Sequence, residues 1–192
     1  LRVEGEIVRD ISLQSAGLLT TRIGGPSVFP PLPAGIAELS YAGNFKWVES
    51  TGADRYRRGL YTFFKRTAPH PSLTIFDCPD ANLTCIERGI SNTPLQALVT
   101  LNNDVFAECA VALAARLQQT ADSATESRIA LVCQICLGRS PQAAEQAELQ
   151  RLLLDLQQLA VSEGLAPAAA EATAWRGLCR AILNLDEFIT RE

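Results

Sequence analysis

The sequence predicts a mainly α-helical protein with a helical, bundle-like C-terminal half and an irregular, Pro/Gly-rich N-terminal half. Its 192 residues are 47% hydrophobic and 20% charged, which fits one globular domain with a hydrophobic core. One-sided apolar stripes at helical spacing follow each other from residue 93 onward. Prolines and glycines are frequent in residues 20–90 instead, and proline cannot continue a helix. We therefore predict two segments, 1–92 and 93–192, within a single domain.

The first segment is predicted to contain one clear helix near its start. Ile7, Ile11 and Ala16 have roughly helical spacing, and Gly17 ends the pattern. Residues 23–36 contain four prolines, which favour an extended path. Because this stretch is also apolar, we expect it to lie over the core rather than to form a free linker.

Residues 56–64 allow two interpretations. Residues 60–64 fit a strand that pairs with residues 45–48, and the stretch also fits a helix, whose apolar side is Tyr56, Leu60, Phe63 and Phe64. We favour the helix. The basic residues at positions 55, 57, 58, 65 and 66 could bind phosphates or sulfated sugars together with the aromatic rings. We favour a charged outer face on a helix whose aromatic face meets the core.

Residues 93–104 have the pattern of a capped helix start. Thr93 suits the N-cap, Pro94 the first helical position and Gln96 the third, where its side chain completes a capping box. We expect this helix to break at residues 102–104. It should direct its apolar side chains into the core, namely Leu95, Leu98 and Val99.

Four more helices are expected after this break, each with one apolar face. They cover residues 105–117, residues 125–137, a stretch that Ser140-Pro141 starts, and a stretch from Pro167 to the C-terminal end. Because each stripe is one-sided, the helices should pack on one another. The predicted core positions include Phe106, Cys109, Leu113, Ile129, Val132, Cys133, Cys136, Leu149, Leu152, Leu153, Leu156, Leu159, Trp175, Leu178, Ile182, Leu185 and Ile189.

Composition argues against two classes of function. Seventeen basic and 21 acidic residues give a net charge of −4, and no long basic stripe occurs, so we expect no nucleic-acid binding. The apolar runs are too short to span a bilayer, so we expect no transmembrane segment. The sequence lacks methionine even at position 1, and we therefore expect it to start inside a longer polypeptide.

Cys133 and Cys136 form a CxxC motif. Residue 137 is Leu rather than the His of a c-type haem site, and no second CxxC supplies further zinc ligands. We therefore expect no metal and no cofactor in this fragment. Cys109 and Cys179 lie, like this pair, in apolar stripes, and all four should be buried. A redox role for the CxxC pair is the alternative.

Cys78 and Cys85 lie in a loop-like stretch, and a local disulfide between them is plausible in an oxidising compartment. Carboxylates lie nearby, at Asp77 in this stretch and at Asp104 in the predicted helix break. Two carboxylates could serve glycoside hydrolysis. We favour solvated or helix-capping roles for them.

His70 is the only histidine, so a Ser–His–Asp or Cys–His site would have to use it. A lone histidine between two prolines is more often simply exposed. Asn92 and Asn103 are candidates for contacts with a substrate, but asparagine favours local bonds with loop backbone groups. The catalytic residues remain unassigned, and the weak candidates are His70, Asp77, Asn92, Asn103 and Asp104.

Four stretches occur in the order typical of one known family: YRRGLYTFFKRTAPHPSLTIFDCPD (56–80), SNTPLQALVTLNND (91–104), CLGRSP (136–141) and NLDEFITRE (184–192). They resemble the planctomycete-specific C-terminal domain of unknown function, DUF1553, of exported cytochrome c-containing proteins. The resemblance implies an extracytoplasmic location, upstream partner domains in the same polypeptide, and haem elsewhere in the full-length protein. It also implies that this chain is the C-terminal part of a larger domain.

Two functions are consistent with these observations. The first is a structural, domain-organising helical module of a multidomain protein. The alternative is part of a hydrolase or lyase acting on environmental polysaccharide, with a site shared with upstream residues. A cleft with several convergent polar groups around residues 91–98 would favour the alternative.

Overall fold

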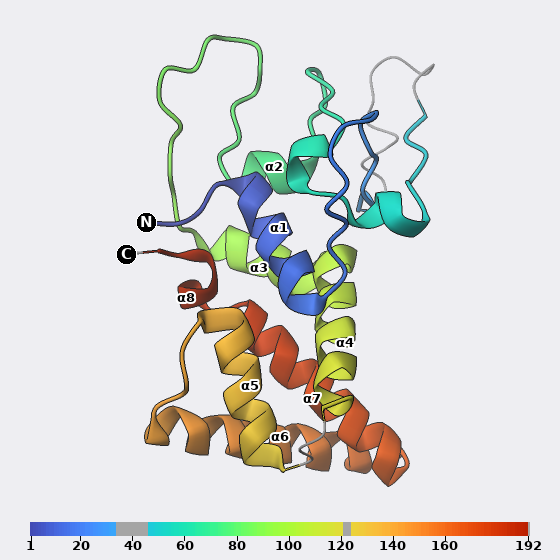
Figure 1. Ribbon diagram of the computed structural model, residues 1–192, viewed down its shortest axis with the longest axis vertical. Coiled ribbons are helices and arrows are strands. Elements are labelled where there is room, and N and C mark those ends of the chain that lie inside the picture. The colour runs from blue at the N-terminus through green and yellow to red at the C-terminus, as the bar shows by residue number, and fades with distance from the viewer. Residues whose placement is uncertain (34–45, 121–123, 192) are drawn as a thin grey trace.

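A computed structural model describes residues 1–33, 46–120 and 124–191 (Figure 1). The fold is mainly helical, as predicted, and within these residues isolated β-bridges take the place of strands. Two 3-10 turns, η2 (Gly52–Tyr56) and η3 (Gly59–Tyr61), interrupt the irregular segment. The helices are α1 (Gly5–Ala16), α2 (Pro71–Ile75), α3 (Pro94–Asn102), α4 (Asp104–Gln118), α5 (Thr125–Leu137), α6 (Ala143–Ser162), α7 (Pro167–Leu183) and α8 (Asp186–Ile189).

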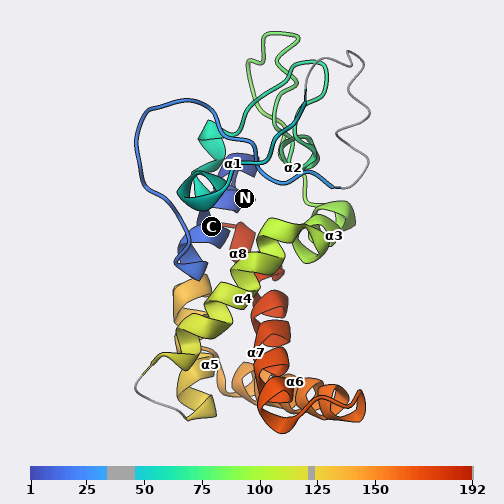
Figure 2. The same ribbon diagram turned by 90° about the vertical axis from the view of Figure 1, so that its right-hand side faces the viewer.

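The core lies between the helices that follow residue 93. α7 packs against α4 and α6, and α1 covers α4 from the N-terminal segment. Figure 2 shows α4 and α7 as two long crossing helices, with α6 running past the far end of α7. The apolar stripes of these helices are buried, which explains their one-sided pattern. Residues at most 1% exposed include Leu113, Leu117, Ile129, Val132, Leu178 and Ile182.

The four cysteines of the apolar stripes are buried, as predicted. Cys109 and Cys179 are 0% exposed, Cys133 is 2% exposed and Cys136 is 6% exposed. Burial raises the pKa of Cys109, Cys136 and Cys179 to about 12, so these thiols stay protonated at neutral pH. Both thiols of the CxxC pair thus pack within the hydrophobic core.

The irregular segment folds differently from the prediction for residues 56–64. The favoured helix does not form there, and neither does the alternative strand. The segment makes the turns η2 and η3 and a parallel bridge between Val28 and Thr62. The expected pairing partner, residues 45–48, lies partly outside the described residues. The prolines of 26–33 explain the result, because their missing N–H groups prevent a continuous ladder.

Arginine side chains donate hydrogen bonds to backbone carbonyls of this segment that have no partner in a helix or strand. Arg57 is 0% exposed, and its guanidinium donates to the carbonyls of Pro26 at 2.9 Å and Gly24 at 2.5 Å. It also lies over the ring of Tyr61, 3.6 Å from the centroid. Arg9 of α1 donates to the carbonyl of Arg57 at 3.2 Å. The expected charged outer face is therefore wrong for Arg57, whose charge points into the fold.

Neighbouring basic residues form ion pairs with the helical layer. Arg55 Nη2 lies 2.5 Å from Glu108 Oε1 on α4, and Arg58 Nε lies 2.7 Å from Asp10 Oδ2 on α1. Asp10 also accepts from the backbone N–H of Gly59 at 2.6 Å. These contacts dock η2 and η3 on the helices.

The helix α3 turns a different face to the core than the sequence predicts. Leu95 is 57% exposed and Leu98 is 55% exposed, whereas Gln96 and Thr100 are buried and Val99 is partly buried. The side-chain amide of Gln96 explains this orientation. It lies inside the fold, where it donates to the Ile75 carbonyl and to the Ser91 hydroxyl, so the leucines of α3 lie on the outer side.

Helix ends near the C-terminus also differ from the prediction. α6 begins at Ala143 rather than at Pro141, because Gln142 and Glu145 form a capping box there. α7 ends at Leu183, and a separate short helix, α8, follows. Leu159 and Leu185, both expected in the core, are 55% and 42% exposed.

The two ends of the described chain lie side by side (Figure 1). The N–H of Val3 donates to the carbonyl of Ile189 at 2.8 Å, and the N–H of Arg191 donates to the carbonyl of Leu1 at 2.8 Å. These bonds attach the segment after α8 to the segment before α1.

No single helix among the described residues is both long enough and apolar enough to cross a membrane. α3 and α4 together pass this test by length and composition, with a bend of 62° between them.

Candidate functional site

A polar cluster, formed by the buried Arg2 and Gln96 and the partly buried Asp77 and Ser91, connects the start of the chain to the loop before α3. Arg2 Nη2 lies 2.5 Å from Asp77 Oδ2, and the N–H of Ser91 donates to the same oxygen at 2.8 Å. The Gln96 amide donates to the Ile75 carbonyl at 2.9 Å and to Ser91 Oγ at 3.0 Å. Arg2 is 5% exposed and Gln96 is 1% exposed. The polar cluster therefore joins three distant parts of the sequence.

Asp77 acts in this cluster as a fixed anion. It follows α2 with a φ of 61°, a left-handed conformation that aspartate tolerates better than most residues. Burial alone would raise the pKa of its carboxyl, but hydrogen bonds from Ser91 and the ion pair with Arg2 outweigh burial and hold the pKa below its ordinary value. Both carboxylate oxygens accept hydrogen bonds. Asp77 is therefore poorly suited to take up a proton.

His70 is buried at 4% exposure rather than exposed. It is the N-cap of α2, where its Nδ1 accepts from the N–H of Ser72 at 3.3 Å. Its Nε2 lies 3.0 Å from the carbonyl oxygen of Pro31, so the neutral tautomer with its proton on Nε2 satisfies both contacts. Burial lowers the pKa of His70 to about 4. At pH 7 the ring is neutral and both of its nitrogens are occupied.

The helix break contains the expected local caps. The capping box of α3 is confirmed: Gln96 donates from its N–H to Thr93 Oγ1 at 3.4 Å, and Thr93 donates from its N–H to Gln96 Oε1 at 3.1 Å. Asn103 caps α4 by accepting from the N–H of Val105 at 3.0 Å. Asp104 is the first residue of α4, where a carboxylate is favourable beside the helix dipole. Both candidates have local structural roles.

A groove of about 300 Å³ lies between α3 and α8 and includes Asn92. The amide of Asn92 donates to Asp186 of α8. The hydroxyl of Thr100 donates to Asn184 Oδ1 at 2.5 Å. The polar side chains of the groove thus pair with each other and hold the α8 region against α3. Asn92 makes this bond across the groove, whereas the sequence predicted a bond to loop backbone.

The candidate residues fall in four separate places. Asp104 lines a surface pocket beside α4 with Arg55 and Glu108. His70 and Asn103 line one small cavity of about 20 Å³ together with Arg9. Asp77 belongs to the polar cluster, and Asn92 lines the groove at α8. This arrangement does not assemble a nucleophile, a base and an acid around one position. Within the part of the chain that the structure describes, no group of three or more His, Cys, Asp or Glu side chains is placed to hold a metal ion.

Cys78 and Cys85 are free thiols in this structure. Cys78 donates to Glu6 Oε1 at 3.7 Å, and Cys85 donates to the carbonyl of Glu87 at 3.2 Å. Burial, reinforced by the negative charge of Glu6, raises the pKa of Cys78 to about 11. A disulfide between the two residues stays a prediction.

Arg2 and Ser91 were not singled out as site residues from the sequence. Arg2 belongs to no recognisable motif, whereas Ser91 begins one of the stretches that resemble the family. Arg57 was considered for binding phosphates or sulfated sugars. The signal for its buried role is the Pro/Gly-rich stretch before it, whose carbonyls need donors, because arginine carries five N–H groups.

The comparisons with known proteins place these contacts in a family. The model of the family described as PSD1, protein of unknown function (DUF1553), matches residues 1–153. No curated protein and no solved structure matches the chain. The matched residues run from α1 into α6 and include the polar cluster, His70, the capping box of α3 and the Asn103 cap. Because the match covers most of its length, the chain belongs to the DUF1553 family of proteins of unknown function.

Proposed function

We propose that this chain is a non-catalytic helical module that organises the domains of a larger extracytoplasmic polypeptide. One observation carries the proposal: the polar side chains best suited to catalysis are occupied by bonds within the chain. Asp77 is paired with Arg2, both nitrogens of His70 have partners, and Asn103 caps a helix. Polar groups used in this way stabilise a fold and leave little capacity for proton transfer.

An exposed apolar surface on α3 supports the domain-organising part of the proposal. Leu95 and Leu98, one turn apart on this helix, are 57% and 55% exposed. Gln96 and Thr100 of the same helix are buried instead. Adjoining exposed apolar side chains can mark a surface that another protein segment covers. We assign this α3 surface to an upstream domain of the same polypeptide.

A hydrolase or lyase would have its site in the groove near residues 91–98. The polar side chains that line this groove, Asn92 with Asp186 and Thr100 with Asn184, pair with each other.

The test uses the full-length protein with Leu95→Asp and Leu98→Asp combined. If the α3 surface contacts an upstream domain, the double variant should loosen the domain arrangement, seen as a larger radius of gyration in small-angle X-ray scattering. The melting temperature of the chain itself should change little, because both side chains are exposed.

The matched control is Leu159→Asp with Val161→Asp on α6, where the side chains are 55% and 50% exposed. This pair introduces the same charge and should leave the scattering profile unchanged. An unchanged profile in the α3 variant would contradict domain organisation. Loss of a polysaccharide-degrading activity in Asn92→Ala, without a change in melting temperature, would contradict the non-catalytic role.

A further inference from the structure

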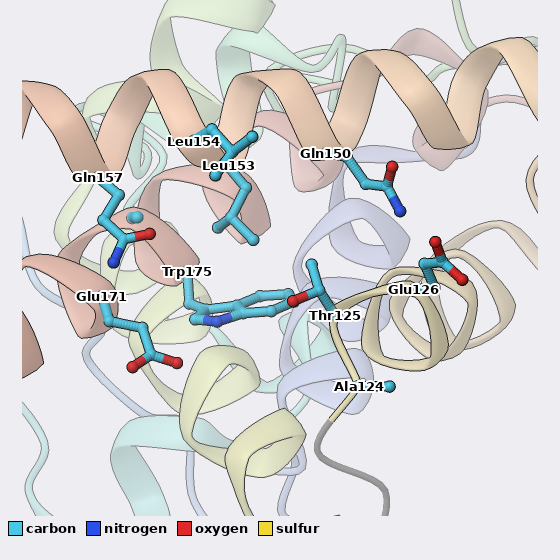
Figure 3. A pocket seen from close by; sticks show the side chains of 10 residues that line it. Ala124, Thr125, Glu126, Gln150, Leu153, Leu154, Gln157, Glu171 and Trp175 are labelled. Atoms are coloured by element: carbon cyan, nitrogen blue, oxygen red, sulfur yellow. The ribbon is translucent and has the colours of Figure 1, made fainter.

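A pocket of about 500 Å³ lies between α5, α6 and α7, at the end of the molecule away from the irregular N-terminal segment (Figures 1 and 3). Its volume is within the range of small-molecule sites. Trp175 and Leu153 form its apolar floor, and polar side chains surround them. The polar residues around the floor are Glu126 of α5, Gln150 and Gln157 of α6, and Glu171 of α7.

The indole of Trp175 has an unused hydrogen-bond donor. The residue as a whole is 2% exposed, but its Nε1 atom is not among the fully buried polar atoms, and no acceptor for its N–H lies among the described residues. Figure 3 shows this nitrogen on the edge of the ring that faces Glu171. The indole N–H of a largely buried tryptophan usually finds a partner, and here that partner comes from outside the protein. The second tryptophan of the chain does so, because Trp47 Nε1 donates to the carbonyl of Pro30 at 2.8 Å. The pocket therefore offers a donor that an oxygen atom of a ligand can use.

The face of the indole is not the part of the ring that a ligand would use. The guanidinium of Arg128 lies over the ring, 6.0 Å from its centroid. The side chain as a whole is nearly inaccessible. A ligand cation therefore cannot stack on this ring, and a ligand must approach its N–H edge.

The polar rim requires a ligand with donors as well as an acceptor. Glu126 and Glu171 supply carboxylate acceptors, and the amides of Gln150 and Gln157 can both donate and accept. The described residues of the lining include no basic side chain. A simple amine would satisfy the carboxylates but not the indole N–H. An anion would be repelled by both carboxylates. A hydroxyl group donates and accepts at once.

We propose that this pocket binds a saccharide, with a ring oxygen or hydroxyl accepting from Trp175 and neighbouring hydroxyls donating to Glu126 and Glu171. This activity is separate from domain organisation and needs no catalytic group.

Isothermal titration calorimetry with cellotetraose, xylotetraose and chitotetraose tests the proposal on the folded chain. We expect at least one of these tetrasaccharides to bind. Trp175→Phe keeps most of the apolar ring and removes the donor, so it should weaken that binding about tenfold, the loss expected for one hydrogen bond. The matched control is Trp47→Phe, which removes the same atoms far from the pocket and should leave the affinity unchanged.

A second variant, Glu171→Gln, tests the proposal even if the Trp175→Phe protein does not fold. Glu171 is exposed, so its replacement leaves the core intact. It should weaken binding, whereas Glu148→Gln, at an exposed position of α6 outside the pocket, should not. Binding by none of the three tetrasaccharides would overturn the proposal. So would binding that neither Trp175→Phe nor Glu171→Gln weakens, or displacement of the bound saccharide by spermidine, which would indicate a cation site.

Discussion

Residues 93–191 bury mainly aliphatic, aromatic and sulfur-containing side chains, whereas residues 1–92 bury Arg2, Asp10, Arg57 and His70 as well. The difference follows from the backbone. In the helical half, most backbone N–H and C=O groups bond within each helix, so the side chains of the core can be apolar. In the irregular half, many backbone carbonyls have no helical N–H to accept from, and the prolines supply no N–H group. Arginine side chains from distant positions donate to these carbonyls instead.

The substitution with the largest expected effect on stability removes one of these arginines from the irregular half. Arg57→Ala would leave the carbonyls of Pro26, Arg22 and Gly24 without their donor and open a cavity beside Tyr61. We expect the free energy of unfolding to fall by about 4 kcal/mol, because hydrogen bonds from charged groups are strong and buried acceptors are costly to leave unmade. Urea unfolding followed by circular dichroism measures it. Arg176→Ala, at an exposed position of α7, is the control and should change stability by less than about 0.5 kcal/mol.

The difference between the two halves also explains which features of the fold could be predicted from the sequence. Stripes of apolar residues predicted α4, α5 and α7, and glycines at 17 and 138 marked helix ends where φ is positive. Those signals are local. The polar cluster depends on Arg2 meeting Asp77, 75 positions away, and no local pattern encodes this pairing. The orientation of α3 was missed for a related reason: the demand of Gln96 for acceptors outweighs the burial of two leucines.

A second prediction addresses the helical half. Leu178 of α7 is 0% exposed within the hydrophobic core, so Leu178→Ala should lower the free energy of unfolding by about 3 kcal/mol through lost burial and the cavity left behind. Leu159→Ala on α6 removes the same atoms from a side chain that is 55% exposed and should cost far less. Equal losses in the two variants, measured by urea unfolding, would mean that the core is not organised around α7.

A third prediction concerns pH and the irregular half. The pKa of His70 is about 4 in the folded protein and about 6.5 in a solvated histidine. Between these values the unfolded chain binds a proton that the folded chain does not, so the free energy of unfolding falls as the pH falls from 6.5 to 4. The loss across this window is about 3 kcal/mol at most. His70→Gln should remove that part of the slope, leaving the contribution of the carboxylates common to both proteins. Parallel stability curves for the two proteins at pH 4–7 would show that His70 is not buried as a neutral ring.

The smallest effect lies at the junction of the two halves, where α3 begins. Thr93→Ala removes the hydroxyl that accepts from the N–H of Gln96. It should lower the free energy of unfolding by about 1 kcal/mol, the usual cost of losing an N-cap. Asn103→Ala removes the cap of α4 and should cost a similar amount, while Asn92→Ala loses an exposed contact with Asp186 and should cost less. If these residues serve only the fold, any activity of the full-length protein should follow stability across the three variants. A catalytic role predicts the reverse: Asn92→Ala or Asn103→Ala would abolish activity with little change in melting temperature, whereas Thr93→Ala would lower the melting temperature and keep the activity. Melting temperature and activity measured on the same preparations separate the two cases, because a capping residue acts through the helix that it begins and a catalytic residue acts through its substrate.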